Sequence, residues 1–150
     1  MKRRGLFWIL LLAVLVLAFI WGNSLLPAEI SGALSAGVKR FLAKLFPGLY
    51  LGGGDHRLRK WAHFLEFWGL GMVLCGLMWL LGGLSRRKIL LSWLGGVLVA
   101  CADEAIQGFV PGRGPGLRDV GIDVLGVTLG IVIISLIYLI KQKRKQSGGK

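Results

Sequence analysis

The sequence predicts an all-α membrane protein with four transmembrane helices and one amphipathic helix lying at the membrane interface. Three observations support this fold class. Of the 150 residues, 55% are hydrophobic, and the apolar runs approach the roughly 20 residues that a helix needs to cross a bilayer. Only seven residues are acidic, and most of them interrupt or border an apolar run. The 19 Lys and Arg residues lie mainly between the runs and at the chain ends.

Each predicted span is an apolar run bounded by charged or turn-forming residues. We place the spans at about 6–26, 61–81, 89–110 and 119–140. Little chain remains outside them, so we expect a single domain over residues 1–150 without a soluble catalytic module. A cleaved signal peptide at the N-terminus is disfavoured, because the first apolar run is long and no small-x-small cleavage site follows it. Cys75 and Cys101 fall inside spans, where we expect them to pack.

The segment at about 28–46 has a different pattern. Its apolar residues, among them Ile30, Leu34 and Val38, recur at helical spacing, while the polar residues mostly take other faces. This pattern is typical of a helix lying on the outer leaflet. Pro47-Gly48 and Gly52–Gly54 then interrupt regular structure. The connection is either a plain loop or a mobile lid over a site, and the pattern leaves both open.

The basic residues predict that both chain termini lie in the cytoplasm. Eleven of the 19 flank the spans on one side, with no acid among them: Lys2, Arg3, Arg4, Arg86, Arg87, Lys88, Lys141, Lys143, Arg144, Lys145 and Lys150. The positive-inside rule places these segments, including a basic tail at 141–150, in the cytoplasm. The net charge of +12 is then explained by topology and anionic lipids, and nucleic acid is not an expected partner.

Polar residues of three predicted spans are expected to form one outward-facing pocket. They are His63 and Glu66, with Arg59 and Lys60 directly before that span; Asp103, Glu104 and Gln107; and Asp119 and Asp123. Within a span, spacings of three, four or seven place residues on one helix face. At about 1.5 Å per residue, the residues from His63 onward in this set all fall in the outer half of the membrane. Ionisable groups at such depth usually face a protein interior and mark a functional site.

Neighbouring residues complete this expected arrangement. The loop 111–118 adds two further cations, Arg113 and Arg118, and Asn23 and Ser24 end the first span on the same side. Gly126 and Gly130 continue the face that carries Asp119 and Asp123. Small residues at such positions allow a second helix to approach closely.

Two segments of the chain resemble a known family. Residues 59–67, Arg-Lys-Trp-Ala-His-Phe-Leu-Glu-Phe, resemble the Lys-x-x-His-Phe-x-Glu-aromatic motif of the VanZ-like family. Residues 103–119 are similar to its Asp-Glu-x-x-Gln, Pro-x-Arg and Asp signature, and Ser24 matches a serine often found after its first span. The chain departs from the family at Asp123, where many members have Asn. The resemblance covers about residues 21–130.

The resemblance implies a small bacterial protein of the cell membrane and cell envelope. The namesake of the family is associated with resistance to teicoplanin, a lipidated glycopeptide antibiotic that acts on the outer face of the membrane. A link between this chain and glycopeptide resistance is therefore an expectation from the resemblance. The resemblance implies no defined reaction.

The pocket residues themselves favour a site for an anionic headgroup of a lipid or lipid-linked envelope precursor. Arg59, Lys60, Arg113 and Arg118 would donate charge-assisted hydrogen bonds to phosphate or carboxylate. The further ligand-binding candidates are Asp103, Gln107, Asp119 and Asp123. The candidate acid–base groups are His63 with Glu66 or Glu104. A divalent metal held by Asp103, Glu104, Asp119 and Asp123 is a further hypothesis, because hard oxygen ligands suit Mg²⁺.

Two other classes of function remain open. A non-enzymatic protein could exclude amphiphiles such as lipoglycopeptides, with the charged cluster only tying helices together. A proton or ion pathway is the least consistent class, because the cytoplasmic halves of the spans carry no charged or strongly polar residue. Sequence motifs of soluble enzymes, such as Walker A, HExxH and GxSxG, are absent. Catalysis and oligomeric state stay undecided.

Overall fold

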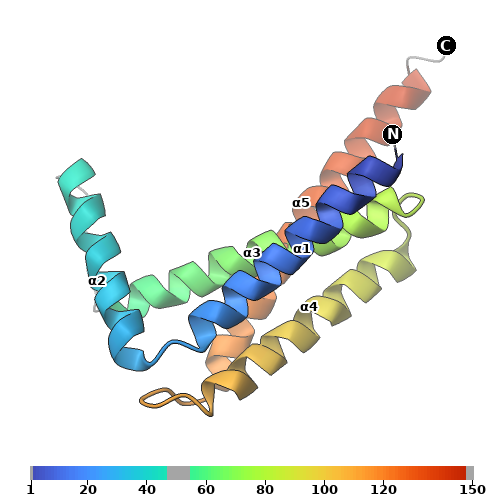
Figure 1. Cartoon of the computed structure of the whole chain (residues 1–150). Helices are drawn as coiled ribbons and strands as arrows, with labels where there is room; N and C mark the ends of the chain where they lie inside the picture. The colour runs from blue at the N-terminus through green and yellow to red at the C-terminus, as the bar shows by residue number, and fades with distance from the viewer. Residues whose placement is uncertain (1, 47–54, 148–150) are drawn as a thin grey trace.

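The computed structural model describes residues 2–46 and 55–147, which form five α-helices (Figure 1). These are α1 (Lys2–Ser24), α2 (Ala28–Leu45), α3 (Asp55–Leu80), α4 (Arg86–Gln107) and α5 (Leu117–Ser147). All except α2 contain stretches long and apolar enough to cross a membrane. The all-α class and the four predicted spans are confirmed, and the chain is a multi-pass membrane protein. The predicted breaks at Pro47-Gly48 and Gly52–Gly54 lie outside the described residues.

Two helices extend beyond the predicted spans. α3 begins at Asp55, before the predicted start at 61, so Arg59 and Lys60 belong to the same helix as His63. α5 passes the predicted end at 140 and runs to Ser147. This extension follows from composition, because Lys, Arg and Gln are good helix formers and no glycine or proline interrupts them before Gly148.

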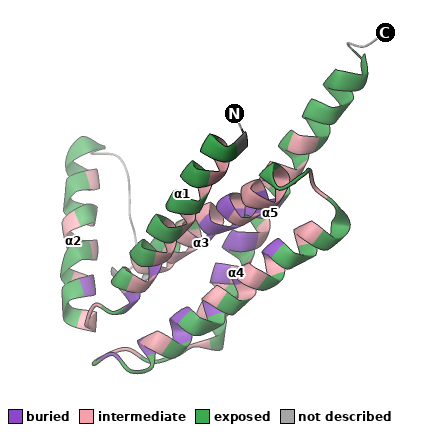
Figure 2. Ribbon diagram, turned by 45° about the vertical axis from the view of Figure 1, so that its right-hand side comes forward, coloured by how far each residue is buried: buried purple, intermediate pink, exposed green. Residues whose placement is uncertain are grey.

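The helix α2 confirms the predicted helical segment after the first span. It begins directly after Pro27 and turns sharply away from α1 (Figure 1). Ser31 is its only buried residue, and large apolar side chains such as Leu34 and Phe41 are exposed. Most of the α2 ribbon is coloured as exposed or intermediate (Figure 2). This exposed apolar surface is consistent with the predicted interfacial location, which stays a prediction.

The helix α3 lies at the centre of the bundle and contacts the other four helices. Its closest neighbour is α5, because glycines remove the side chains between the two backbones. A Cβ atom added at Gly126 would lie 2.5 Å from the carbonyl oxygen of Phe64, and one at Gly130 would collide with the carbonyl oxygen of Trp68. The predicted role of Gly126 and Gly130 in close helix packing is confirmed.

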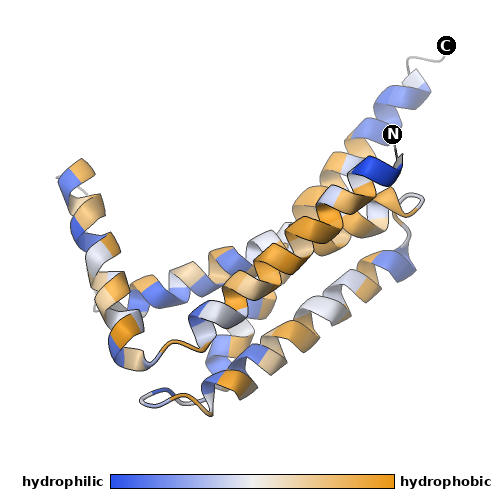
Figure 3. Cartoon of the chain, in the orientation of Figure 1, coloured by the Kyte–Doolittle hydropathy of each residue, from blue (hydrophilic) through white to orange (hydrophobic). Residues whose placement is uncertain are grey.

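Polar and apolar residues are distributed unevenly along the long axis of the molecule. A small apolar core, which includes Phe67, Leu70 and Val127, lies between the helices. Most of the length of α1 is apolar and exposed (Figure 3), as expected for a surface facing lipid. Both termini lie at one end of the bundle, and α2 and the α4–α5 loop lie at the other end (Figure 1). The buried polar residues described next gather at this second end.

Candidate functional site

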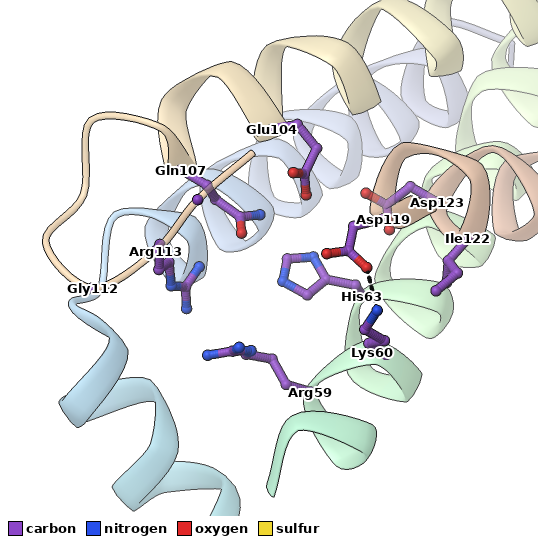
Figure 4. A pocket seen from close by; sticks show the side chains of 11 residues that line it. Arg59, Lys60, His63, Glu104, Gln107, Gly112, Arg113, Asp119, Ile122 and Asp123 are labelled. Carbon is purple, nitrogen blue, oxygen red and sulfur yellow. Dashed lines mark ion pairs between the residues drawn. The ribbon is translucent and has the colours of Figure 1, made fainter. Parts of the chain in front are cut away.

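A polar cavity of about 180 Å³ opens among α3, α4, α5 and the α4–α5 loop (Figure 4). Eight of the eleven site residues predicted from the sequence line it: Arg59, Lys60, His63, Glu104, Gln107, Arg113, Asp119 and Asp123. The lining also includes Gly112, Gly114 and Ile122. The predicted gathering of polar groups from three helices is thus present in the structure.

Asp103 lies behind the cavity and joins α4 to α1. Its side chain is fully buried. Its Oδ2 accepts hydrogen bonds from the Ser24 hydroxyl, at 2.8 Å, and from the Gln107 amide, at 2.9 Å. The Nδ1 atom of His63 lies 3.8 Å from the same oxygen, which is beyond hydrogen-bond distance. Ser24 on α1 therefore binds Asp103, and His63 on α3 lies close to it without a hydrogen bond.

Glu104 holds the loop that carries Arg113. Its Oε2 accepts a 2.7 Å hydrogen bond from the backbone N–H of Gly116. Within the loop, the N–H of Arg113 donates to the carbonyl of Val110 at 3.1 Å, and Gly112 has a φ of +74°. Proline followed by a glycine of positive φ is typical of a type II turn. The turn and the Glu104 contact together fix the position of Arg113.

The guanidinium of Arg113 points back into the protein. Its Nη1 donates to the backbone carbonyl of Ser24 at 3.3 Å. Burial lowers the pKa of Arg113, and the nearby positive charge of Arg59 lowers it further. Figure 4 shows both arginine side chains extending into the cavity, with the His63 ring at its centre. The two arginines thus lie together on the loop side of the cavity, whose lining also carries the carboxylates of Glu104, Asp119 and Asp123.

Lys60 and Asp119 form an ion pair between α3 and α5. The Nζ and Oδ1 atoms are 2.7 Å apart, and the two side chains remain 31% and 34% exposed. An ion pair that is open to solvent contributes at most about 1 kcal/mol to stability. We therefore regard this pair as part of the cavity rim more than as a major source of stability.

Three predicted residues lie outside the cavity lining. Asp103 is buried behind it, as described. Glu66 accepts a 2.8 Å hydrogen bond from the side chain of Asn23 and faces α1, so the carboxylate nearest to His63 is Asp103. Arg118 is exposed at the start of α5. The Ser24 carbonyl and the Gly116 N–H were not predicted as partners, because backbone groups leave no signal in the sequence.

An apolar groove of about 450 Å³ adjoins the polar cavity, between α1, α2 and α3. Most of its lining is apolar, including Phe19, Leu34 and Trp61. Arg59, His63 and Arg113 line both the groove and the polar cavity. The two spaces therefore lie next to each other, with these three side chains between them.

The acidic residues do not form the all-carboxylate metal set that the sequence suggested. Glu104 is engaged by Gly116, and Asp119 pairs with Lys60. The structure instead brings together His63, Asp103 and Asp123, each with a ligand atom within 4.8 Å of the others.

Comparison with known proteins agrees with the motifs found in these helices. Searches of curated proteins and of solved structures gave no match. The family model described as VanZ/LLP1 matches residues 7–138, which include every residue that lines the cavity. The chain therefore belongs to the VanZ/LLP1 family.

Proposed function

We propose that this protein binds the anionic headgroup of a membrane lipid or lipid-linked envelope precursor in the polar cavity. The observation that carries the proposal is that Arg59 and Arg113 line both the cavity and the apolar groove. An amphiphile has a charged group joined to an apolar chain. It could place the charged group between the two arginines and the apolar chain in the groove.

The charge in the cavity supports an anionic ligand. Burial and the proximity of Arg59 lower the pKa of Arg113, and the carboxylates of Asp103, Glu104 and Glu66 offset this only in part, so the charged guanidinium is disfavoured in its present surroundings. An anion bound beside both arginines would offset the lost solvation and their mutual repulsion. Guanidinium groups also bind phosphate and carboxylate through two parallel hydrogen bonds.

The size of the cavity limits what can enter it. An engineered cavity of about 150 Å³ admits benzene, so a cavity of about 180 Å³ suits a phosphate or a small carboxylate group. A complete glycopeptide antibiotic is far larger. We therefore propose that any link to teicoplanin resistance operates through the envelope lipid, without entry of the antibiotic into the cavity.

We further propose that the cavity faces the extracytoplasmic side. The cavity lies at the end of the bundle opposite the two termini (Figure 1), and the basic residues near those termini favour the cytoplasm. The proposal covers binding only. The predicted acid–base partners of His63 are hydrogen-bonded to other groups, Glu66 to Asn23 and Glu104 to the N–H of Gly116.

The proposal is tested by measuring the affinity of the protein for anionic envelope lipids in nanodiscs of matched composition. Arg113→Ala should weaken binding about 10-fold to 100-fold, because a hydrogen bond to a charged group contributes about 1.5–3 kcal/mol. Arg113→Lys should also weaken binding, because an ammonium group cannot reproduce the two parallel bonds. Arg118→Ala removes the same charge from an exposed position on the same side and should change the affinity little.

A second candidate function is an exclusion protein whose polar cluster only ties helices together. The contact of Asp103 with Ser24 favours it, because this buried hydrogen bond joins α4 to α1. Equal lipid binding by wild type, Arg113→Lys and Arg113→Ala would support this second function. In cells, any increase in teicoplanin resistance caused by the protein should be lost with Arg113→Ala under the first function only.

A further inference from the structure

We propose that His63, Asp103 and Asp123 bind one divalent transition-metal ion at the buried side of the cavity. The three residues come from α3, α4 and α5. They offer one imidazole nitrogen and two carboxylate oxygens, all within 4.8 Å of one another. Metal binding would be a property of the protein alone, and it does not depend on the proposed headgroup.

Unsatisfied buried atoms are the second observation behind this site. Asp103 is 0% exposed and Asp123 is 1% exposed. Asp103 Oδ1, Asp123 Oδ2 and His63 Nδ1 are buried without a hydrogen-bond partner among the described residues. A buried polar atom without a partner is unfavourable by about 1–3 kcal/mol, and more if it is charged. A bound cation would satisfy all three residues at once.

The surrounding hydrogen bonds leave these three residues available as ligands and orient the carboxylate of Asp103. Ser24 and Gln107 donate to Oδ2 of Asp103, the oxygen that lies 3.8 Å from Nδ1 of His63, and Oδ1 has no hydrogen-bond partner among the described residues. Such hydrogen bonds to a ligating carboxylate are typical of metal sites. The other two acids near the cavity already have partners, since Glu104 accepts from Gly116 and Asp119 pairs with Lys60.

The ligand types indicate the class of metal. Imidazole favours Zn²⁺ and related transition metals, whereas Mg²⁺ prefers oxygen ligands and retains several waters. Metal–ligand bonds of about 2.0–2.2 Å require the ligand atoms to move closer than the present 4.8 Å limit. Three protein ligands leave coordination positions for water or substrate. His63 and Asp123 line the cavity, so those positions would face the space in which we place the headgroup.

The test uses the full chain in detergent, purified through a tag without histidine and stripped with EDTA. Zn²⁺, Mn²⁺ and Mg²⁺ are titrated separately by calorimetry, without added lipid. We expect one Zn²⁺ per chain, bound at least about 10-fold more tightly than Mg²⁺. Loss of an outer hydrogen-bond partner of a metal ligand typically weakens affinity about 10-fold to 100-fold. His63→Gln and Asp123→Asn remove direct ligands and should weaken Zn²⁺ binding by more than that.

A matched control and a second readout separate a metal site from a structural cluster. Glu29→Gln removes an exposed carboxylate from α2 and should bind Zn²⁺ like the wild type. Zn²⁺ should raise the melting temperature of the wild type and of Glu29→Gln, but not of the two ligand variants. Without metal, Asp123→Asn should melt no lower than the wild type, because it removes a buried, unsatisfied carboxylate.

Two results would overturn the metal site. One is the absence of stoichiometric Zn²⁺ binding by the folded wild type. The other is binding that His63→Gln leaves unchanged, which would locate the metal elsewhere. Neither result bears on the lipid affinities of the Arg113 variants, so failure of the metal site and failure of headgroup binding are distinguishable.

Discussion

Asp103 and Glu104 are neighbours in the chain but bind different parts of the molecule. Successive residues on an α-helix point about 100° apart, because 3.6 residues complete a turn. Asp103 therefore reaches Ser24 on α1, whereas Glu104 reaches the N–H of Gly116 in the loop before α5. Asp103 positions the buried side of the cavity, and Glu104 positions the loop that carries Arg113.

Substitutions at Glu104 should separate its hydrogen bond from its charge. Glu104→Gln retains an oxygen that accepts from Gly116, so we expect nearly unchanged thermal stability and lipid binding. Glu104→Leu leaves the Gly116 N–H without this acceptor, and we expect a loss of about 1–3 kcal/mol. The measurement is the melting temperature in detergent together with lipid affinity. Loss of binding by Glu104→Gln at an unchanged melting temperature would show that the negative charge itself acts in the site.

The contact between α3 and α5 is the packing on which the cavity depends, because these helices supply Arg59, Lys60, His63, Asp119 and Asp123. Gly126 and Gly130 let the two backbones meet, as does Gly71 from the α3 side. In a lipid environment, helix association relies on such close van der Waals packing, since burial of apolar surface from water provides little drive. These glycines therefore set the distance between α3 and α5, which form two walls of the cavity.

Matched glycine substitutions on α5 should show this dependence. Gly126→Ala places a methyl group 2.5 Å from the Phe64 carbonyl oxygen, and overpacking of this kind typically destabilises by about 1–3 kcal/mol. Gly121→Ala is the control, because no atom lies within 4 Å of the added Cβ. The control should leave stability unchanged or raise it slightly through better helix propensity. Unfolding midpoints in detergent measure both, and equal midpoints would contradict the close-packing account.

Across the whole molecule, the chain passes along the bundle four times and separates two kinds of polar surface. The basic ends of α1 and α5 lie at one end, and the polar cavity lies at the other (Figures 1 and 3). The four long helices run along the bundle in alternating directions (Figure 1). The direction in which the bundle crosses the membrane is a prediction from the basic residues.

Cysteine labelling in intact cells should establish this direction. In a Cys75→Ala, Cys101→Ala background, Gly114→Cys should react with a membrane-impermeant reagent added outside. Arg87→Cys should react only after the membrane is permeabilised. Gly114 suits this purpose because it is exposed and no atom lies within 4 Å of a Cβ added there. Labelling of Gly114→Cys only after permeabilisation would invert the orientation and place the cavity on the cytoplasmic side.

The sequence alone determined the four apolar helices, the helix after the first span and the set of polar residues near one end. These features are local, because hydropathy and helical periodicity are read within a single segment. The tertiary structure decided which of those polar residues are partners. It joined Asp103 to Ser24, Glu104 to Gly116, and Lys60 to Asp119.

The same distinction explains the residues whose placement differs from expectation. Glu66 shares a helix face with His63, yet it is turned to Asn23 on α1, and Arg118 is exposed although it follows the loop that holds Arg113. Helical spacing specifies a face, but it does not specify which neighbouring helix covers that face. That choice depends on the packing of α5 against α3 through glycines and on backbone groups that every sequence contains, so only the folded chain decides it.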